Sequence, residues 1–304
     1  MAKTKKKRFD KSKAFFIFCC CIVPVLNWLL NYVYVNVDAF TMAFTTKDGG
    51  FTLDHFGRFF AEMTNPESGL REAFRNTFLT FAIIFVTYPF KVLVSYFLYK
   101  KVPGSSFFRI VFFLPGIIFS VALAMIFNKM IGVNGVIAQT VQKWLDLDYV
   151  PTLLADSRFA NTTVLLHMLW MNFPGDLIIW GGAFARLPED VMESARIDGV
   201  TWWQEFTKIT IPLVWPTVAM KMVLLFCGIF GAEGAVFLLT KGDYGTNTFS
   251  TWMYLQLLNN TGTYKTSNAY YYMSAVGLVI TAIAITISLT IRRYMDKVFD
   301  DVEY

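Results

Sequence analysis

The feature that most constrains this chain is a set of long stretches that are nearly free of charge. Crossing a bilayer as a helix takes about 20 mostly apolar residues. The stretches of that length are residues 14–37, 76–99, 110–128, 159–185, 209–240 and 266–291. The charged residues within them are Lys91, Asp176, Lys221 and Glu233. The sequence therefore predicts an all-α integral membrane protein with six transmembrane helices.

Composition supports this interpretation. A soluble domain has about 25% charged residues, whereas this chain has 16%, with 55% hydrophobic residues. These values exclude an ordinary soluble enzyme. The first stretch is too long for a cleaved signal peptide and lacks a cleavage pattern. The adjacent Cys19, Cys20 and Cys21 lie inside it, and we interpret them as small apolar helix residues.

The distribution of lysine and arginine predicts the orientation of the chain. Of these residues, 16 fall in the N-terminal tail, in the loops after the second and fourth stretches and in the C-terminal tail, against nine in the other loops. Cytoplasmic loops carry the excess of positive charge, so both termini are expected in the cytoplasm. The predicted organisation is a basic cytoplasmic tail (1–13), a first span (14–37), an extracytoplasmic loop (38–75), a core with five spans (76–291) and a cytoplasmic tail (292–304).

Prolines are expected to interrupt the second to fifth spans. They are Pro89, Pro115, Pro174 and Pro216. Interrupted helices are tolerated in membranes where neighbouring helices or a cavity satisfy the freed backbone groups. This pattern favours a protein that lines a path over a simple anchor.

The loop after the fourth span, residues 186–212, contains its own helix signals. Pro188 is suited to a helix start, and Gly199 can close that helix with a positive φ. Thr201 and Gln204 then have the spacing of a capping box. The loop is therefore predicted to be a compact helix–turn–helix rather than a simple linker.

This loop also has an apolar surface and ends at Pro212. Its apolar residues are Val191, Ala195, Ile197, Trp202, Trp203 and Phe206. If exposed, they would form a docking face for another protein. The alternative is an interfacial helix whose tryptophans lie among lipid headgroups.

The same loop resembles the coupling motif of binding-protein-dependent ABC importer permeases. The matching residues are Glu193, Ser194, Ala195, Asp198, Gly199, Ile209, Ile211 and Pro212, with Ser194 in place of alanine and Ile211 in place of leucine. Trp170 to Gly182 and Phe237 to Asp243 are similar to the carbohydrate-type permeases of the maltose and glycerol-phosphate class, although Asp243 replaces a usual glycine. The resemblance covers about residues 76–292 and implies the type I ABC importer permease fold.

The resemblance implies partners for this chain. They are a second homologous permease subunit, two ATP-binding subunits and an extracytoplasmic solute-binding protein that delivers a small solute, here a sugar or oligosaccharide. The chain has no P-loop and no Gly-Lys pair, so ATP and magnesium are expected on the partner ATPase, not on this non-catalytic chain. We expect a bacterial cell membrane location, with contacts to lipid and none to nucleic acid.

Polar and small residues in the fourth and fifth spans are the candidates for the substrate pathway. By resemblance they are Asn172, Gly175, Gly228, Ile229 and Ala232. Asp176, Glu233, Trp170 and Phe173 join them because carboxylates and aromatic rings suit sugars, and ionisable groups in a membrane are functional candidates. The alternative is that Asp176 or Glu233 pairs with a residue of a partner chain.

The remaining ionisable residues receive plainer interpretations. Lys91 and Lys221 are expected to extend toward the cytoplasmic surface. His167 is expected to be a hydrogen-bonded helix residue, and no metal site is predicted because no second His or Cys has ligand spacing. An ion-coupled secondary carrier using Asp176 and Glu233 stays as the alternative function, although it should show inverted repeats and none is evident. An intramembrane enzyme would need a nucleophile or metal set that the sequence lacks.

Overall fold

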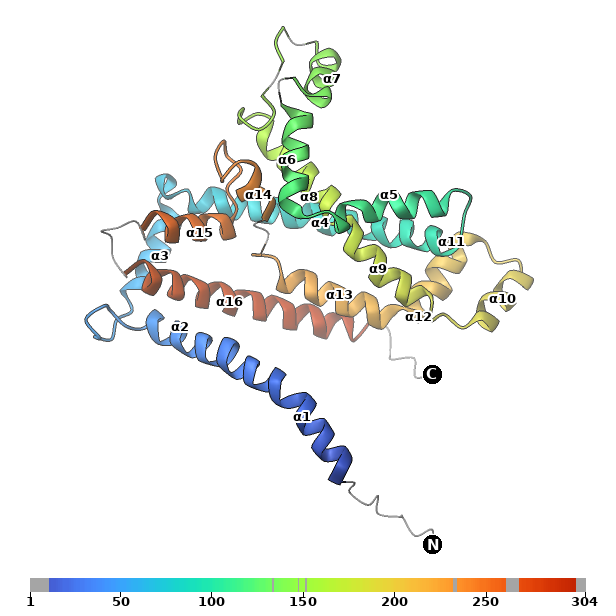
Figure 1. The fold of residues 1–304 in the computed structure, drawn as a ribbon, viewed down its shortest axis with the longest axis horizontal. Helices are drawn as coiled ribbons and strands as arrows, with labels where there is room; N and C mark the ends of the chain where they lie inside the picture. The colour runs from blue at the N-terminus through green and yellow to red at the C-terminus, as the bar shows by residue number, and fades with distance from the viewer. Residues whose placement is uncertain are drawn as a thin grey trace. The chain divides into compact units, whose positions relative to one another are not determined.

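The computed structural model describes residues 11–132, 134–146, 148–150, 152–231, 234–260 and 268–298 (Figure 1). Within these ranges its regular elements are helices, apart from one isolated β-bridge. The structure divides into two units. Unit 1 comprises Met1–Phe60 and Asn260–Val279, and unit 2 comprises Ala61–Asn259 and Ile280–Tyr304. Several predictions from sequence lie outside the described residues, namely those for the first ten residues, Ala232, Glu233, Lys265 and residues 299–304.

Unit 1 begins with a nearly continuous helix. It consists of α1 (Lys11–Trp28), the π-helical turn η1 (Leu29–Tyr34) and α2 (Val35–Ala43). Phe15–Ala43 is long and apolar enough to cross a membrane, and none of its most apolar window is buried within the structure. Its apolar side chains are therefore available to lipid. The three adjacent cysteines are exposed on α1.

The rest of unit 1 connects this helix to the start of the last one. The hairpin after α2 closes with an isolated bridge between Thr45 and Phe51, followed by α3 (Asp54–Thr64). The Nε2 atom of His55 lies 3.1 Å from the carbonyl oxygen of Thr45. The Arg58 guanidinium lies 4.2 Å from the ring centroid of Tyr272 on α16, in the geometry of a cation–π contact.

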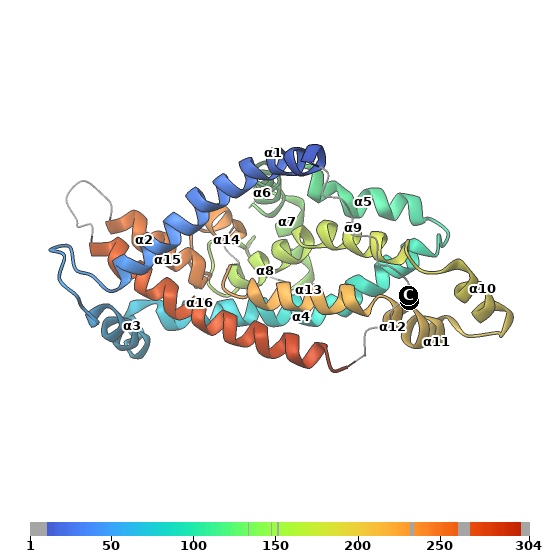
Figure 2. The same ribbon diagram turned by 90° about the horizontal axis from the view of Figure 1, so that it is seen from below.

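Unit 2 contains most of the helices. After η2 (Pro66–Ser68) they are α4 (Leu70–Tyr99), α5 (Ser105–Ile117), α6 (Ser120–Ile131), α7 (Val136–Trp144), α8 (Ala160–Met171), α9 (Phe173–Phe184), α10 (Glu189–Ile197), α11 (Trp202–Gln204), the π-helical η3 (Glu205–Thr210), α12 (Ile211–Leu213), α13 (Trp215–Cys227), α14 (Gly234–Leu239) and α15 (Phe249–Asn260). The last helix, α16 (Asn268–Met295), belongs to both units. The short helices α10, α11 and α12 lie together at one end of unit 2 (Figure 2).

Helix α4 is the scaffold of unit 2. It packs along α9 and α5. Its residues Tyr88, Val92 and Tyr96 are buried against Trp180 and Phe184 of α9. Between membrane helices such contacts stabilise the fold through van der Waals packing, because lipid tails are as apolar as these side chains. Asn76, near the other end of α4, donates from Nδ2 to the carbonyl oxygens of Gly245 (2.8 Å) and Asn247 (2.9 Å), which fixes the loop before α15.

The prolines interrupt the helices at three of the four predicted places. Helix α4 continues through Pro89, so the break expected there is wrong. Pro115 lies just before the end of α5, and the chain bends by 107° between α5 and α6. Pro174 and Pro216 lie in the first turns of α9 and α13, where the missing N–H costs no intrahelical bond. A bend of 74° precedes α13.

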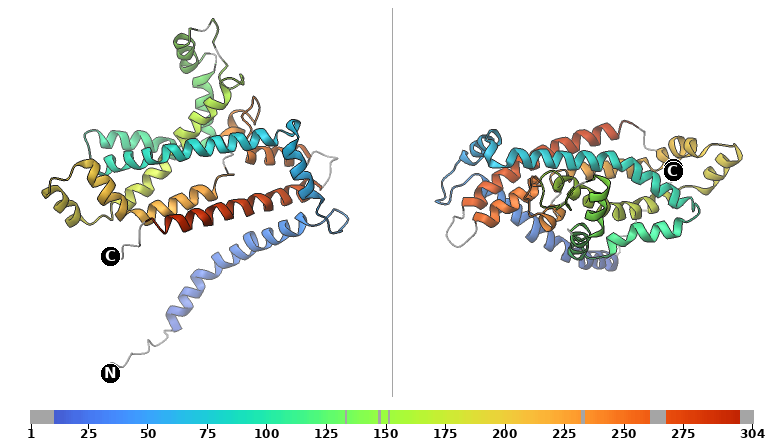
Figure 3. Two further views of the ribbon diagram at one scale, coloured as in Figure 1. Left: turned by 180° about the vertical axis from the view of Figure 1, so that it is seen from behind. Right: turned by 90° about the horizontal axis from the view of Figure 1, so that it is seen from above.

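Helix α7 forms a small substructure with the end of α6 and the segment between α7 and α8. In Figure 3, left, this green segment extends away from the other helices of unit 2. Ile131, Ala138 and Leu153 form its local apolar cluster. Val136 and Trp144 are exposed. The segment is thus held by its own contacts rather than by the main core.

The contact between α5 and α9 depends on a glycine. A Cβ atom built on Gly116 would lie 2.7 Å from the Cβ of Pro174. Carbon atoms cannot approach so closely, and the proline ring cannot rotate away. The close packing of these two helices therefore requires glycine at position 116.

We predict that Gly116→Ala destabilises the protein, because overpacking of this kind costs about 1–3 kcal/mol. Gly182→Ala on α9 is the matched control, since nothing lies within 4 Å of a Cβ at that position. Thermal unfolding in lipid nanodiscs should show a lower midpoint for Gly116→Ala and no loss for Gly182→Ala. Equal midpoints for Gly116→Ala and the unaltered protein would contradict the proposed packing.

Candidate functional site

A buried ion triad joins the helices α4, α9 and α13. The Asp176 Oδ2 atom lies 3.1 Å from Lys91 Nζ, and Asp176 Oδ1 lies 2.7 Å from Lys221 Nζ. Lys91 Nζ also donates to the Asn172 carbonyl oxygen over 3.4 Å. The side chains of Lys91, Asp176 and Lys221 are 2%, 13% and 17% exposed. Charges this well shielded need partners, and each finds one here.

The triad corrects two interpretations of the sequence. Lys91 and Lys221 do not extend toward a surface; both turn inward to Asp176. Asp176 is paired within its own chain, whereas the sequence interpretation considered a partner chain. Sequence spacing could not reveal this, because the three residues come from different helices.

A cavity of about 430 Å³ lies within unit 2. It is lined by Ile84 of α4, Ser120 of α6, residues of α8 and its C-cap (His167, Met168, Met171, Asn172), residues of α13 and the segment after it (Leu224, Leu225, Gly228, Gly231), and Ala235 and Leu238 of α14. None of these lining residues is Asp, Glu, Lys or Arg. The wall is apolar, with a hydroxyl, an imidazole and an amide as its polar side-chain groups, as is common in small-molecule sites.

Helix breaks coincide with the polar parts of this wall. Ser120 directly follows the bend after α5, and Asn172 lies between α8 and α9. Gly228 ends α13, and Gly231 lies in the segment before α14. Irregular backbone at membrane depth is tolerated where it lines a cavity or is buried in protein. The breaks are therefore consistent with a polar path through the helices.

The structure brings together some of the residues predicted for the substrate pathway. Asn172 and Gly228 line the cavity. Asp176 is engaged in the triad, and Ile229 is buried. Ala232 and Glu233 lie outside the described residues.

The other three residues predicted for the substrate pathway, Trp170, Phe173 and Gly175, are not among the residues that line the cavity. Trp170 is partly exposed, and its ring packs edge-on against His167 at 6.0 Å. The Phe173 ring packs against Phe112 at 4.9 Å. Gly175 is exposed, with nothing within 4 Å of a Cβ at that position.

His167 is a cavity residue that the sequence interpretation missed. Its side chain is buried, and neither ring nitrogen has a hydrogen-bond partner among the described residues. The expectation of a hydrogen-bonded helix residue is therefore wrong. The available signal was a single histidine in the apolar second half of the helix, residues 164–171. Across the described ranges, no group of three or more His, Cys, Asp or Glu residues is placed to hold a metal ion.

The second candidate region is residues 186–212, which we call the coupling segment. Glu189 and Asp190 occupy the first turn of α10, and Gly199 follows the helix with φ of +70°. The Thr201–Gln204 capping box is present, with the Gln204 amide nitrogen 3.4 Å from Thr201 Oγ1 and the Thr201 amide nitrogen 3.1 Å from Gln204 Oε1. The predicted helix–turn–helix is confirmed, and its second helix ends one residue beyond Pro212.

The surface of the coupling segment is partly apolar. Ile197 is 80% exposed, and Trp202 and Trp203 are each about half exposed. Ala195 and Phe206 are buried, so the expectation that they contribute to an exposed face is wrong. Among the motif residues, Glu193, Ser194, Asp198 and Gly199 are exposed, while Ile209 and Pro212 are partly buried.

Glu205 anchors the coupling segment to α4. It is buried, and its Oε1 atom accepts a hydrogen bond from the Tyr96 hydroxyl over 3.0 Å and pairs with Lys100 Nζ. The Tyr96 and Phe206 rings pack with centroids 5.0 Å apart. The sequence interpretation missed Glu205, because a glutamate on a short helix between two predicted spans gives no sign of burial.

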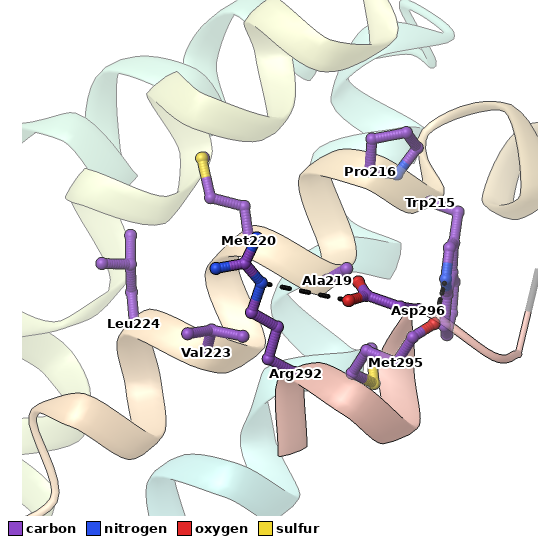
Figure 4. A pocket seen from close by; sticks show the side chains of 9 residues that line it. All are labelled: Trp215, Pro216, Ala219, Met220, Val223, Leu224, Arg292, Met295 and Asp296. Atoms are coloured by element: carbon purple, nitrogen blue, oxygen red, sulfur yellow. Dashed lines mark hydrogen bonds and ion pairs between the residues drawn. The ribbon is translucent and has the colours of Figure 1, made fainter. Parts of the chain in front are cut away.

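A second groove, of about 360 Å³, lies between α13 and the end of α16 (Figure 4). The Trp215 indole donates to the Met295 carbonyl oxygen over 3.2 Å, and Arg292 lies 3.9 Å from Asp296 on one wall. These contacts join the first turn of α13 to the last turn of α16. We assign the groove no binding role, since its charged groups pair with one another.

Comparison with known proteins identifies relatives of this chain. The family model described as "Binding-protein-dependent transport system inner membrane component" matches residues 56–300. The multiple sugar-binding transport system permease protein MsmF of Streptococcus mutans is 25% identical over 203 residues, which cover 66% of this chain and 67% of MsmF.

Two solved structures share the fold. One is a bacterial ABC transporter involved in the import of the acidic polysaccharide alginate, with a TM-score of 0.77, 22% identity and coverage of 94% of this chain and 97% of that chain. The other is a bacterial alginate ABC transporter in complex with an alginate pentasaccharide-bound periplasmic protein, with a TM-score of 0.76, 22% identity and coverage of 96% and 98%. At this identity the likeness concerns the fold.

We predict that Asp176→Asn lowers stability by about 3–5 kcal/mol, because it leaves two buried lysines without a carboxylate. The triple variant Lys91→Met, Asp176→Leu, Lys221→Met should recover most of that loss, since apolar residues of similar size can replace a buried ion cluster. Thermal unfolding in nanodiscs measures both. If Asp176→Asn is as stable as the unaltered protein, the triad does not hold the three helices together.

Proposed function

This chain belongs to the family of binding-protein-dependent transport system inner membrane components, so it is a permease subunit of an ABC importer, and we propose that it forms half of the translocation pathway for a sugar or oligosaccharide. The observation that carries the proposal is the coupling segment, which follows α9 and precedes α13 in the chain. A movement of this segment would act directly on two helices that meet at the buried triad.

The proposed membrane arrangement has six spans with both termini in the cytoplasm. Phe15–Ala43, Leu70–Tyr99 and Ala269–Met295 are long and apolar enough to cross. The bent pair α5–α6 can supply one broken span. Helices α13 and α14 would supply another, because α11 and α12 belong to the coupling segment. Helices α8 and α9, separated by Asn172, would supply the sixth. The lysine and arginine bias supports the orientation.

The proposed solute class rests on two considerations. MsmF is named as a permease of a multiple sugar-binding system, and the two structural neighbours are described as alginate ABC transporters. The cavity offers hydroxyl, imidazole and amide groups within an apolar wall. The hydroxyl groups of a sugar can hydrogen-bond to these polar groups, and its apolar ring faces can pack against the apolar wall. We place its path along Asn172 and Gly228.

The proposed role of the coupling segment is to dock onto an ATPase. Ile197, Trp202 and Trp203 provide exposed apolar surface, and aromatic side chains of this kind are typical anchors in protein interfaces. The capped helices on either side of Gly199 hold these side chains in place. ATP and magnesium then belong to the ATPase subunits. A second homologous permease would complete the pathway.

A solute-binding protein on the opposite side completes the proposed assembly. The alginate transporter was solved with such a periplasmic protein bound. The ion-coupled carrier alternative loses its main support, because Asp176 is held by two lysines. Each carboxylate oxygen of Asp176 already contacts a lysine ammonium group, which would compete with a coupling cation for the same oxygen atoms.

We predict that affinity purification of this chain from its own membranes recovers a homologous permease and an ATP-binding protein. The ATPase activity of that complex should rise when sugar-loaded binding protein is added. Mass spectrometry and phosphate release provide the measurements. Purification as an active homomer that transports without ATP would contradict the assembly and favour a secondary carrier.

We predict that Glu193→Lys and Gly199→Pro abolish uptake while the chain stays in the membrane. Glu193 is exposed on α10, and proline cannot adopt the φ of +70° that position 199 requires. Glu189→Lys makes the same charge change on the same helix outside the motif and should retain most uptake. The measurement is radiolabelled solute uptake, with immunoblots of membranes. Normal uptake in Glu193→Lys and Gly199→Pro would rule out the coupling role.

A further inference from the structure

The imidazole of His167 has no visible role in holding the fold together. Both ring nitrogens are shielded from solvent, and neither has a hydrogen-bond partner in the part of the chain that the structure describes. Buried polar groups are nearly always paired, so an unpaired one indicates a function or a missing partner. A phenylalanine or leucine would fill the same space without this penalty.

The surroundings of His167 point to a ligand. The residue lines the 430 Å³ cavity together with Ser120 and Asn172. Its ring packs against Phe127 at 4.7 Å and against Trp170 at 6.0 Å. These aromatic neighbours hold the ring in position but offer no conventional hydrogen-bond acceptor for its N–H group. Since no described residue pairs with the imidazole, a molecule in the cavity is placed to do so.

We propose that His167 binds a hydroxyl group of the transported solute, which makes it a specificity-determining residue of the pathway. This proposal rests on the proposed function as a sugar permease. An imidazole can donate from one nitrogen and accept at the other, and a sugar hydroxyl can likewise do both. Met168, Met171 and Leu224 on the same wall suit the apolar face of a sugar ring.

Binding requires the ring nitrogens to become accessible. In this conformation neighbouring side chains cover them. Met168 and Met171 flank the cavity on the same side, and methionine is unbranched and changes rotamer readily. A rotamer change of such side chains would open the way from the cavity to the imidazole.

The test compares His167→Phe, which keeps the ring volume but removes both nitrogens, with His167→Gln, which keeps a donor and an acceptor. Thr163→Val is the matched control. Thr163 lies one turn earlier on α8, is buried, and donates its hydroxyl only to its own helix, at the Phe159 carbonyl oxygen (2.9 Å). Each variant is expressed with the complete transporter in a strain lacking the natural copy.

Uptake is measured with radiolabelled maltose, lactose, raffinose and maltotriose, and then with monodeoxy analogues of the sugar taken up. His167→Phe should raise the KM about tenfold with a smaller change in maximal rate, and His167→Gln should recover part of the affinity. Thr163→Val should match the unaltered transporter. Immunoblots and ATPase stimulation by binding protein check assembly.

The analogues separate binding from folding. One deoxy analogue should be taken up about tenfold less efficiently by the unaltered transporter, because its site loses a hydrogen bond. In His167→Phe, this analogue and the parent sugar should be taken up with equal efficiency, because the hydrogen bond is already absent. Equal discrimination in both proteins would overturn the contact while leaving the sugar function in place. Failure of the unaltered transporter to take up any of the sugars would overturn the proposed function and this contact together.

Discussion

The carboxylate of Asp176 between two lysines is the interaction on which the arrangement of unit 2 depends. Ionisable groups are costly within an apolar helix bundle unless they are paired. Each of the three helices must therefore keep its charged residue at the level of the other two. A shift of one residue along any helix moves its side chain by about 1.5 Å and rotates it by about 100°, which would leave a buried charge unpaired. The triad thus fixes the register of α4, α9 and α13 more strictly than apolar packing can.

Helix α4 also contacts the coupling segment directly, further along the helix than the triad. Lys91 reaches the triad, and Tyr96 and Lys100 reach Glu205 in the coupling segment. Lys91 and Lys100 are separated by about 13 Å along the helix. The coupling segment is therefore connected to α4 both directly, through Glu205, and indirectly, through α9 and α13. A displacement of the segment has to move α4 with it or break contacts to a buried glutamate.

Local features of the fold could be predicted from the sequence, and non-local ones could not. The Thr201–Gln204 capping box and the positive φ of Gly199 depend on neighbouring residues, so their spacing was sufficient. The partners of Lys91 and Lys221 come from another helix, and apolar periodicity does not specify which lysine faces which carboxylate. Proline gave a mixed result, because Pro115 lies beside a bend whereas α4 continues through Pro89. Membership of the candidate cavity was the least predictable, since His167 differs from a structural histidine only in lacking a partner.

The geometry suggests how the two candidate regions are linked. Helix α9 begins next to Asn172 at the cavity and ends before the coupling segment, and α13 begins after the segment and ends at Gly228, again at the cavity. Each is a rod of about 18–20 Å, and Asp176 and Lys221 connect the two rods. Rigid helices transmit displacement, while breaks absorb changes in backbone angle. A movement that begins at the coupling segment therefore has its first flexible positions at Asn172 and Gly228, which form part of the cavity wall.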